Sequence, residues 1–349
     1  MTRPRPAAFA VPGDLDTLTG GYIYERRLLD GLRAEGRAVE HIALPGSFPD
    51  PTEADTATTA ARLAAVDPGT ALILDGFLSG ALDPGAVARI RAPFVAMVHH
   101  PLALESGLSG DRARHLHGTE RANLAMAAHV LVPSPHTRGI LIDRYDVPAA
   151  KITVARPGVD RPGGTPDPAD PPMILSVGIL HPRKGHDVLL RALARLTDLR
   201  WTATIVGADW HPAHAAEVRA LAADPALKGR VTLAGRVGTK ALHRHYRRAT
   251  VFALATRYEG YGIVFDEALA AGLPIVSCAT GAVPDTVPPD AGLLVPPDDP
   301  DAFADALRSL LTDGTERAAR TAAARRHGAR LPTWAGTAAI ASGVLDALP

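Results

Sequence analysis

The sequence predicts two α/β domains of similar size, each with a parallel β-sheet covered by helices on both faces. Three observations lead to this prediction. The chain has 349 residues, more than a single hydrophobic core usually accommodates. Short runs that are apolar throughout alternate with amphipathic stretches along the chain, as buried parallel strands and their covering helices do. A segment rich in Pro, Gly and Asp near the middle interrupts that alternation, which then restarts.

The first domain is expected over residues 1–158. Its apolar runs predict strands at residues 7–11, 71–74, 94–98 and 129–132. Apolar residues at helical spacing between these runs predict helices at residues 22–32, 57–65 and 112–127. Strands and helices therefore alternate in the order that a parallel sheet requires.

A linker and a second domain follow. Residues 159–172 contain too many Pro, Gly and Asp residues for a packed element and are expected to be extended. The second domain is expected over residues 173–331, with strands at 173–177, 201–206, 231–233, 251–254, 274–277 and 292–295. A last helix is expected within residues 332–349.

The bulk composition excludes several classes of protein. Lys plus Arg and Asp plus Glu both number 37, so a nucleic-acid binder with a broad basic surface is not expected. The single cysteine, Cys278, excludes an intramolecular disulfide framework, and its apolar neighbours predict a buried thiol. No apolar window approaches a membrane span and no signal peptide is evident, so we expect a cytoplasmic protein without a transmembrane segment.

Residues 257–274 carry the strongest chemical signal. Glycines at 260 and 262 allow a sharp turn after the strand at 251–254, and a helix is expected from about residue 263 to Gly272. The free backbone amides of Tyr261, Gly262 and Ile263 would then point out of a helix start, which favours an anion such as a diphosphate. Glu267 would lie about 6 Å along that helix, within reach of a ribose. Glu259 precedes the helix and would face the sugar.

With these residues placed, a family resemblance can be stated. The two glutamates seven residues apart, the Gly-Tyr-Gly between them and the Glu-Ala-Leu-Ala-Ala-Gly-Leu-Pro that begins at the second resemble glycosyltransferase family four, group 1. The resemblance implies the GT-B fold, in which two Rossmann-like α/β domains face each other across a cleft and the last helix crosses back to the N-terminal domain. It also implies a retaining hexosyltransferase that uses a nucleotide diphosphate sugar as a substrate, with neither cofactor nor metal.

Four other segments resemble the family in its own order. Arg183 and Lys184, after the strand at 173–177, correspond to the residues that contact the donor diphosphate. Two cations there would stabilise the departing diphosphate without a metal. Gly20 and Gly21, after the first strand, correspond to the glycine loop that lets the backbone approach the donor phosphate. Val237 lies in the loop whose backbone meets the base, and His99 corresponds to the histidine that faces the donor sugar, although His100 stays open for that role. The catalytic candidates are therefore His99, Glu259, Arg183 and Lys184. The donor-binding candidates are Gly20, Gly21, Gly178, Arg183, Lys184, Val237, Glu259, Tyr261, Gly262, Ile263 and Glu267.

The substrates are less well defined. UDP- and GDP-sugars are the expected donors, and the acceptor is a small molecule, a glycan or a lipid-linked molecule. Acceptor contacts are expected from N-terminal loops and helix starts, at Tyr22, Tyr24, Glu105 and Ser134. The segment before Arg183 departs from the family pattern by its His181-Pro182, which puts the shape of the phosphate loop in doubt.

Other functions fit less well. The Asp14-Leu15-Asp16 sequence resembles the metal site of a different transferase fold but follows the first strand directly, the wrong place for it. A Rossmann dehydrogenase would need a Gly-x-Gly-x-x-Gly fingerprint, which is missing. A sugar-nucleotide epimerase and a catalytically inactive nucleotide-sugar-binding protein remain as alternatives. The basic residues at 244–248 favour a solvated helix face and leave a peripheral membrane contact open.

Overall fold

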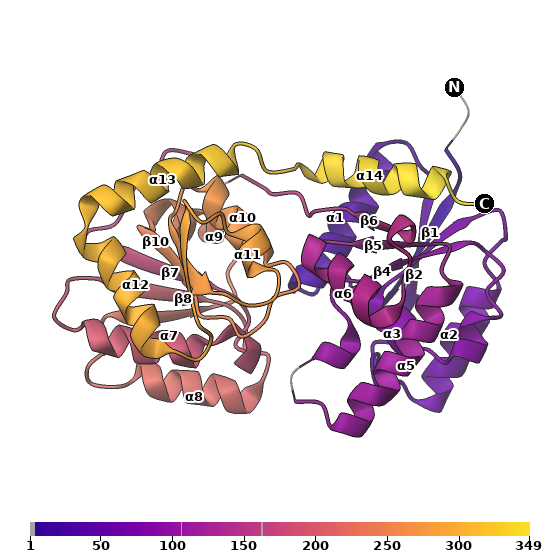
Figure 1. The fold of residues 1–349 in the computed structure, drawn as a ribbon, viewed down its shortest axis with the longest axis horizontal. Helices are drawn as coiled ribbons and strands as arrows, with labels where there is room; N and C mark the ends of the chain where they lie inside the picture. Colours follow the sequence, from indigo (N-terminus) through magenta and orange to yellow (C-terminus); the bar gives the residue numbers. More distant parts are fainter. Residues whose placement is uncertain (1–3, 106, 162) are drawn as a thin grey trace. The chain divides into compact units, whose positions relative to one another are not determined.

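The chain divides into two compact units, each with its own parallel sheet (Figure 1). The computed structural model describes residues 4–105, 107–161 and 163–349. Unit 1 comprises Met1–Gly158 and Pro332–Pro349, and unit 2 comprises Val159–Leu331. Pro162, within the predicted linker, lies outside the described residues.

The sheet of unit 1 has six parallel strands in the order β2-β1-β3-β4-β5-β6. The chain runs from β1 to β2 on one side and then resumes with β3 on the other side of β1, so β1 and β3 flank a topological switch point. In such sheets ligands bind outside the carboxyl ends of the strands at this point. The strands are β1 (Ala7–Pro12), β2 (Val39–Leu44), β3 (Ala71–Leu74), β4 (Phe94–Met97), β5 (His129–Val132) and β6 (Ile152–Val154).

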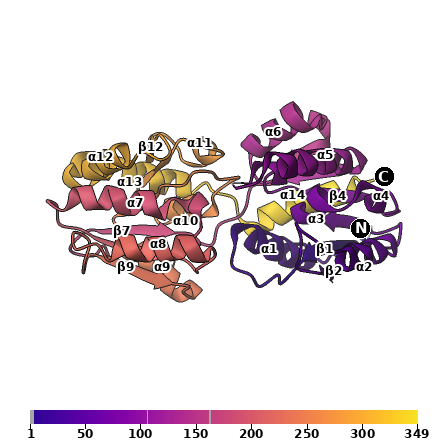
Figure 2. The ribbon, with the colours of Figure 1, turned by 90° about the horizontal axis from the view of Figure 1, so that it is seen from below.

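Helices cover both faces of this sheet (Figure 2). Successive strand residues point to opposite faces, so Phe9 and Ile73 pack on one side while Ala10 and Leu74 pack on the other. The helices are α1 (Gly20–Ala34), α2 (Glu53–Ala64), α3 (Gly76–Ala81), α4 (Pro84–Val87), α5 (Gly110–Met126), α6 (Pro135–Tyr145) and α14 (Trp334–Asp346), with 3-10 turns η1 (Leu102–Leu104) and η2 (Ala149–Lys151).

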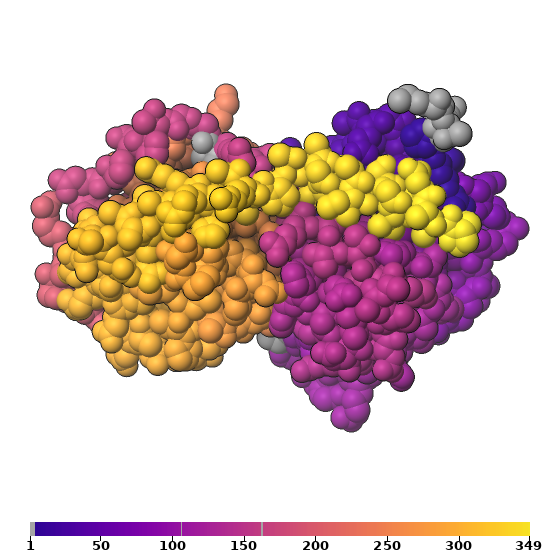
Figure 3. All heavy atoms as spheres, turned by 45° about the horizontal axis from the view of Figure 1, so that its top comes forward, coloured from indigo at the N-terminus to yellow at the C-terminus, as the bar shows by residue number. Residues whose placement is uncertain are grey.

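The last helix belongs to unit 1 although its sequence follows unit 2. Ala338, Ala341 and Leu345 of α14 are buried in the same core as Leu28 and Leu32 of α1. In Figure 3 the yellow C-terminal residues lie against the atoms of unit 1. The buried guanidinium of Arg37 donates hydrogen bonds to Ser342 and Asp346, at 2.7 Å and 2.9 Å.

The sheet of unit 2 also has six parallel strands, in the order β12-β11-β10-β7-β8-β9. Counted from β7, this is the 3-2-1-4-5-6 order of dinucleotide-binding folds, with the switch point between β7 and β10. The strands are β7 (Met173–Val177), β8 (Thr202–Val206), β9 (Val231–Gly235), β10 (Val251–Leu254), β11 (Ile275–Cys278) and β12 (Gly292–Val295).

Two helical layers cover the unit 2 sheet, and apolar residues fill both interfaces. Helices α7, α8 and α12 pack on one face, where Cys278 is buried, and α9, α10 and α13 pack on the other. The elements are α7 (His186–Leu193), α8 (Pro212–Ala222), α9 (Thr239–Arg248), α10 (Ile263–Ala270), α11 (Val283–Thr286), α12 (Pro300–Thr312) and α13 (Gly314–Gly328), with 3-10 turns η3 (Pro182–Lys184) and η4 (Ala194–Leu196).

The predicted fold class of two Rossmann-like α/β domains is confirmed. All six strands predicted in the second half are present, within two residues at either end. In the first half, β2 and β6 were missed. Both are edge strands, and β2 alternates between buried and exposed residues while β6 has only three residues. Among the described residues, no helix is long and apolar enough to cross a membrane.

Candidate functional site

The residues predicted to bind the donor gather at the switch point of unit 2. Gly178 follows β7, and the turn η3 carries Arg183 and Lys184. The loop with Glu259 follows β10, which pairs directly with β7. Parallel pairing therefore brings the two loops to the same edge of the sheet.

Backbone contacts hold these two loops together. The carbonyl of Arg183 accepts hydrogen bonds from the amide of Arg257 at 2.8 Å and from the hydroxyl of Thr256 at 2.9 Å. Gly185 has a φ of +62°, and a Cβ there would lie 1.8 Å from the carbonyl oxygen of Ala255. Any side chain at this position would push the loops apart, because neither the backbone angle nor the space accommodates one.

Glu259 is buried between the two predicted phosphate-binding cations. Only 4% of the residue is exposed, and its carboxylate lies 2.5 Å from Lys184 Nζ and 3.7 Å from Arg183 Nη1. Burial by itself raises the pKa of Glu259, but the charges of Lys184 and Arg183 outweigh it and hold the pKa below its ordinary value. Glu259 is therefore ionised at neutral pH, and it pairs with both cations, which the sequence had not indicated.

Helix α10 begins beside Glu259 with an open N-terminus. Gly262 is its N-cap with a φ of +88°, and this residue has no side chain that could cap the helix. A Cβ at Gly262 would lie 2.6 Å from the Phe265 ring, so the tight turn requires glycine. The predicted positions Tyr261 and Ile263 flank this turn, which leaves a helix start able to receive an anion.

Glu267 lies one turn into α10 and has a partner that the sequence did not reveal. The hydroxyl of Tyr246, on α9, donates to Glu267 Oε2 at 2.6 Å. Burial raises the pKa of Glu267, and the hydrogen bond from Tyr246 offsets part of that effect. Val237 lies just before α9, so Tyr246 is on the helix that follows the predicted base-binding loop. The spacing of Tyr246 and Glu267 along the chain carries no signal of this contact.

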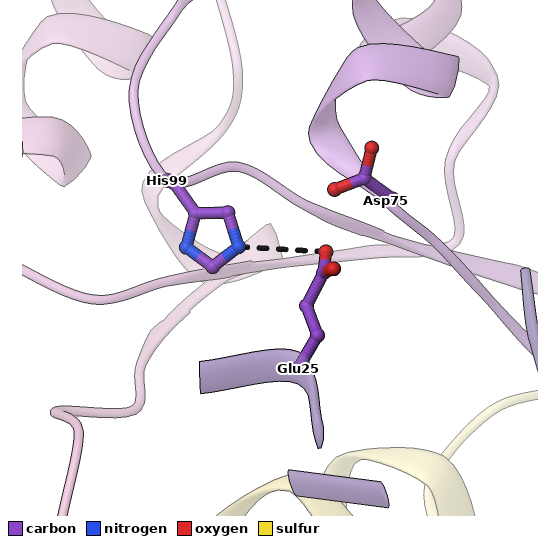
Figure 4. A group of neighbouring side chains, drawn as sticks. All are labelled: Glu25, Asp75 and His99. Carbon is purple, nitrogen blue, oxygen red and sulfur yellow. Dashed lines mark ion pairs between the residues drawn. The ribbon is translucent and has the colours of Figure 1, made fainter. Parts of the chain in front are cut away.

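In unit 1, His99 meets two buried carboxyl groups at the switch point (Figure 4). Glu25 comes from α1, Asp75 follows β3 directly, and His99 follows β4. The Nε2 atom of His99 lies 3.5 Å from Oε1 of Glu25, and donor atoms of all three residues lie within 4.8 Å of one another. Neither Glu25 nor Asp75 was predicted from the sequence as a site residue. Asp75 could have been found, because it ends a buried strand, whereas Glu25 resembles an exposed helix residue.

The glycines predicted to approach the donor form the first turn of α1. Gly20 begins the helix with no neighbour near its missing Cβ, and a Cβ at Gly21 would lie 3.4 Å from the ring of His99. His100 has a different partner, because its Nε2 pairs with Glu105 at 2.7 Å. His99 and His100 therefore lie in different surroundings, and only His99 meets the buried acids.

Two of the four predicted acceptor contacts lie at buried positions. Tyr24 is buried, and its hydroxyl donates to the carbonyl of Ala155 at 2.7 Å. Ser134 is also buried, and its hydroxyl oxygen caps α6 by accepting the amide of Thr137 at 3.0 Å. Both side chains are therefore engaged in packing or capping. Glu105 and Tyr22 are partly exposed, and Tyr22 donates to the carbonyl of Pro12.

Comparison with known proteins covers both units. Residues 163–327 match the family described as glycosyl transferases group 1, and residues 72–161 match glycosyltransferase family 4. A solved structure of sucrose-phosphate synthase from Thermosynechococcus elongatus has a TM-score of 0.83 and 23% identity, covering 97% of this chain and 98% of that one. This structure shares the fold.

Two curated proteins resemble the sequence more closely. A D-inositol 3-phosphate glycosyltransferase of Xylanimonas cellulosilytica is 35% identical over 198 residues, covering 56% of this chain and 46% of that protein. A GDP-mannose-dependent alpha-(1-6)-phosphatidylinositol monomannoside mannosyltransferase of Mycobacterium tuberculosis is 34% identical over 212 residues, covering 55% and 54%. The chain thus spans about half the length of these relatives.

Proposed function

We propose that this chain, which matches the group 1 and family 4 glycosyltransferases, belongs to them and transfers a sugar from a nucleoside diphosphate to a hydroxyl group of an acceptor. The observation that carries the proposal is the buried contact of Glu259 with Arg183 and Lys184 beside the uncapped start of α10. It gathers two cations and free amides around a single carboxylate, which suits a diphosphate linked to a sugar.

The donor diphosphate takes over the cations when it binds. Its oxygens replace Glu259 as partners of Lys184 and Arg183, and the amides at Gly262 and Ile263 receive the remaining charge. Glu259 then faces the sugar, and Glu267 holds the ribose. The cations also stabilise the charge that grows on the diphosphate as it leaves, so this step needs no metal.

Transfer proceeds with retention of anomeric configuration. The bond from the anomeric carbon to the diphosphate breaks as a bond to the acceptor oxygen forms on the same face. The proton of the acceptor hydroxyl passes to the departing phosphate oxygen, so no separate carboxylate base takes part. The partial positive charge on the anomeric carbon is stabilised by the nearby carboxylate of Glu259.

The relatives suggest which substrates to try first. One is named for D-inositol 3-phosphate, the other for GDP-mannose and a phosphatidylinositol monomannoside. We propose a UDP- or GDP-sugar as the donor and an inositol-containing molecule as the acceptor. The test is to incubate the protein with each donor, with and without D-inositol 3-phosphate or phosphatidylinositol monomannoside, and to identify products by mass spectrometry and NMR.

The matched variants are Lys184→Ala and, as a control in the same unit, Lys228→Ala, which changes an exposed lysine. We expect Lys184→Ala to lower turnover by about 10- to 100-fold, the scale of one lost charge-stabilising contact, and Lys228→Ala to leave it unchanged. Equal turnover in both variants would contradict the proposed diphosphate site. Conversion of the donor sugar without any acceptor would identify an epimerase instead, and nucleotide-sugar binding without any product would identify an inactive binding protein.

A further inference from the structure

Among the described residues, no Lys or Arg neutralises the acid pair of unit 1. Glu25 is 1% exposed and Asp75 is 4% exposed. In the described part of the chain, the one basic group in contact with Glu25 is the imidazole of His99, which carries a charge only when it is protonated. Tyr22 and Tyr24 of α1 also lie near the pair, and neither supplies positive charge at neutral pH.

Two neighbouring carboxyl groups without a cation cannot both ionise at low cost. Burial raises the pKa of Glu25 to about 7, and burial together with the charge of Glu25 raises that of Asp75 well above its ordinary value. One oxygen of Asp75 is already engaged, because Oδ1 accepts the amide of Phe77 at 2.8 Å. A single proton held between the two carboxyl groups relieves their repulsion and leaves one negative charge on the pair.

His99 is neutral in this environment, because burial lowers its pKa by more than the charge of Asp75 raises it. A neutral imidazole donates through one nitrogen and accepts through the other. Nε2 of His99 and Oε1 of Glu25 are both buried and have no other hydrogen-bond partner, and they lie 3.5 Å apart. A small movement makes this a hydrogen bond that satisfies both atoms if the proton is on Nε2.

We infer that Glu25 and Asp75 form a proton-sharing carboxyl pair that fixes His99 in the Nε2–H tautomer and leaves Nδ1 as a hydrogen-bond acceptor. Nδ1 lies on the side of the ring away from Glu25 (Figure 4). If the proposed function holds, the hydrogen-bond partner of Nδ1 is a hydroxyl group of the donor sugar. Glu25 and Asp75 are then positioning residues, which act on the ligand through His99 and select a group that donates a hydrogen bond.

The experiment is a long-range proton–nitrogen NMR correlation on the full-length protein with ¹⁵N-labelled histidine. The His99 signals are assigned by their loss in His99→Gln. We expect a protonated Nε2 and an unprotonated Nδ1 from pH 6 to 8, in the absence of any substrate. Glu25→Gln keeps an acceptor oxygen for Nε2 and a donor for Asp75, so we expect the same tautomer. Glu25→Leu removes the acceptor, and we expect Nδ1–H to become populated. Glu35→Gln, at the exposed end of the same helix, is the control.

A second variant keeps the test informative if Glu25→Leu does not fold. Asp75→Asn localises the negative charge on Glu25, so His99 should take up its second proton at a higher pH than in the unchanged protein. Turnover should fall at least tenfold in Glu25→Leu but less than threefold in Glu25→Gln. Only Glu25→Leu removes the acceptor that holds His99 in the Nε2–H tautomer.

Three outcomes would overturn the inference. They are an Nδ1–H tautomer or an imidazolium in the unchanged protein at pH 7, an unchanged tautomer in Glu25→Leu, and stabilisation by added Zn²⁺ or Mn²⁺ that Glu25→Gln abolishes. The last would mean that the acids are ionised and hold a cation. The NMR result needs no substrate, so the expected tautomer together with no transfer from any donor would contradict the proposed function alone.

Discussion

Each unit places a buried glutamate at the switch point of its sheet, and the neighbours shift the pKa values of the two glutamates in opposite directions. Glu259 in unit 2 lies beside β7 and β10, and Glu25 in unit 1 lies beside β1 and β3, each pair of strands flanking a switch point. Glu259 meets two cations and its pKa is lowered, whereas Glu25 meets a second acid and its pKa is raised to about 7.

The difference shows that the fold provides the position and the neighbours decide the chemistry. Both sites collect residues from the carboxyl ends of adjacent parallel strands. Arg183 and Lys184 make the unit 2 site an anion-binding site. Their positive charges pair with Glu259 when no donor is bound and with the diphosphate when it is. The unit 1 site is anionic itself and suits hydroxyl groups, which an uncharged histidine can bind.

The largest expected effect is that of Glu259→Gln on turnover. The variant keeps the shape of the side chain and removes the charge beside the anomeric carbon, so we expect kcat to fall by about 100- to 1,000-fold. Lys184 and Arg183 lose their partner, so affinity for the bare nucleoside diphosphate should stay equal or increase. Calorimetric titration of the nucleotide and steady-state kinetics measure both. Weaker nucleotide binding in this variant would show that Glu259 holds the nucleotide rather than the sugar.

Glu267→Ala is expected to act on binding instead. The ribose contact is present in both the ground and the transition state, so nucleoside diphosphate affinity should fall about 10- to 100-fold while kcat at saturating donor changes little. Tyr246→Phe removes only the 2.6 Å hydrogen bond that positions Glu267, and we expect less than a tenfold loss. The same titrations compare the two variants. A kcat loss without an affinity loss in Glu267→Ala would assign Glu267 to the reacting sugar.

The pH dependence of stability should separate the two glutamates. The pKa of Glu25 rises from 4.5 to about 7 on folding. Its contribution to the free energy of unfolding is therefore complete below pH 4.5 and is lost as the pH rises through 7. Because that of Glu259 falls below 4.5, its contribution is present above that pH and is lost in acid.

Melting temperatures measured from pH 5 to 8.5 give the test. Between these pH values, ionisation of Glu25 should lower the free energy of unfolding by on the order of 2–3 kcal/mol. This corresponds to a fall in melting temperature of roughly 5 °C for a domain of this size. Glu25→Gln should remove this loss and Glu35→Gln should not. Identical pH profiles for the two variants would mean that Glu25 is ionised throughout this range.

The smallest expected effect is that of a chelator. Arg183, Lys184 and the start of α10 bind the diphosphate charge, and the shared proton leaves only one negative charge on the acids of unit 1. Turnover in excess EDTA should therefore stay within twofold of its value without EDTA. If EDTA abolishes turnover and Mn²⁺ restores it, a cation is required at one of the two switch points. The difference in charge proposed between the two sites would then be wrong.

The sequence predicts the two sheets well and the partners of the site residues poorly. Apolar strands such as 71–74 and 251–254 are recognisable because burial on both faces restricts their composition. The open helix start at Gly262 follows from local glycines. The contact of Glu259 with Lys184 joins residues 75 positions apart, and no local pattern encodes it.

Contacts between distant segments also explain why the burial of Tyr24 in unit 1 was not predicted. Tyr24 follows the glycines at the start of α1, where an exposed aromatic residue would suit an acceptor. It is buried because α14 packs on α1, and the ring of Trp334 lies 5.8 Å from its own. A contact between segments about 300 residues apart turns a surface position into a core position.

Because α14 completes unit 1, the order of synthesis and the order of folding differ. The strands of unit 1 leave the ribosome before unit 2, but the helix that buries Leu28 and Leu32 and engages Arg37 is made after unit 2. Unit 2 is one continuous segment and can close while unit 1 still exposes an apolar face. That face includes α1, which carries Glu25. The core that supports the acid pair is therefore complete only when α14 has emerged, and a nascent chain halted before α14 would expose the apolar residues that this helix covers.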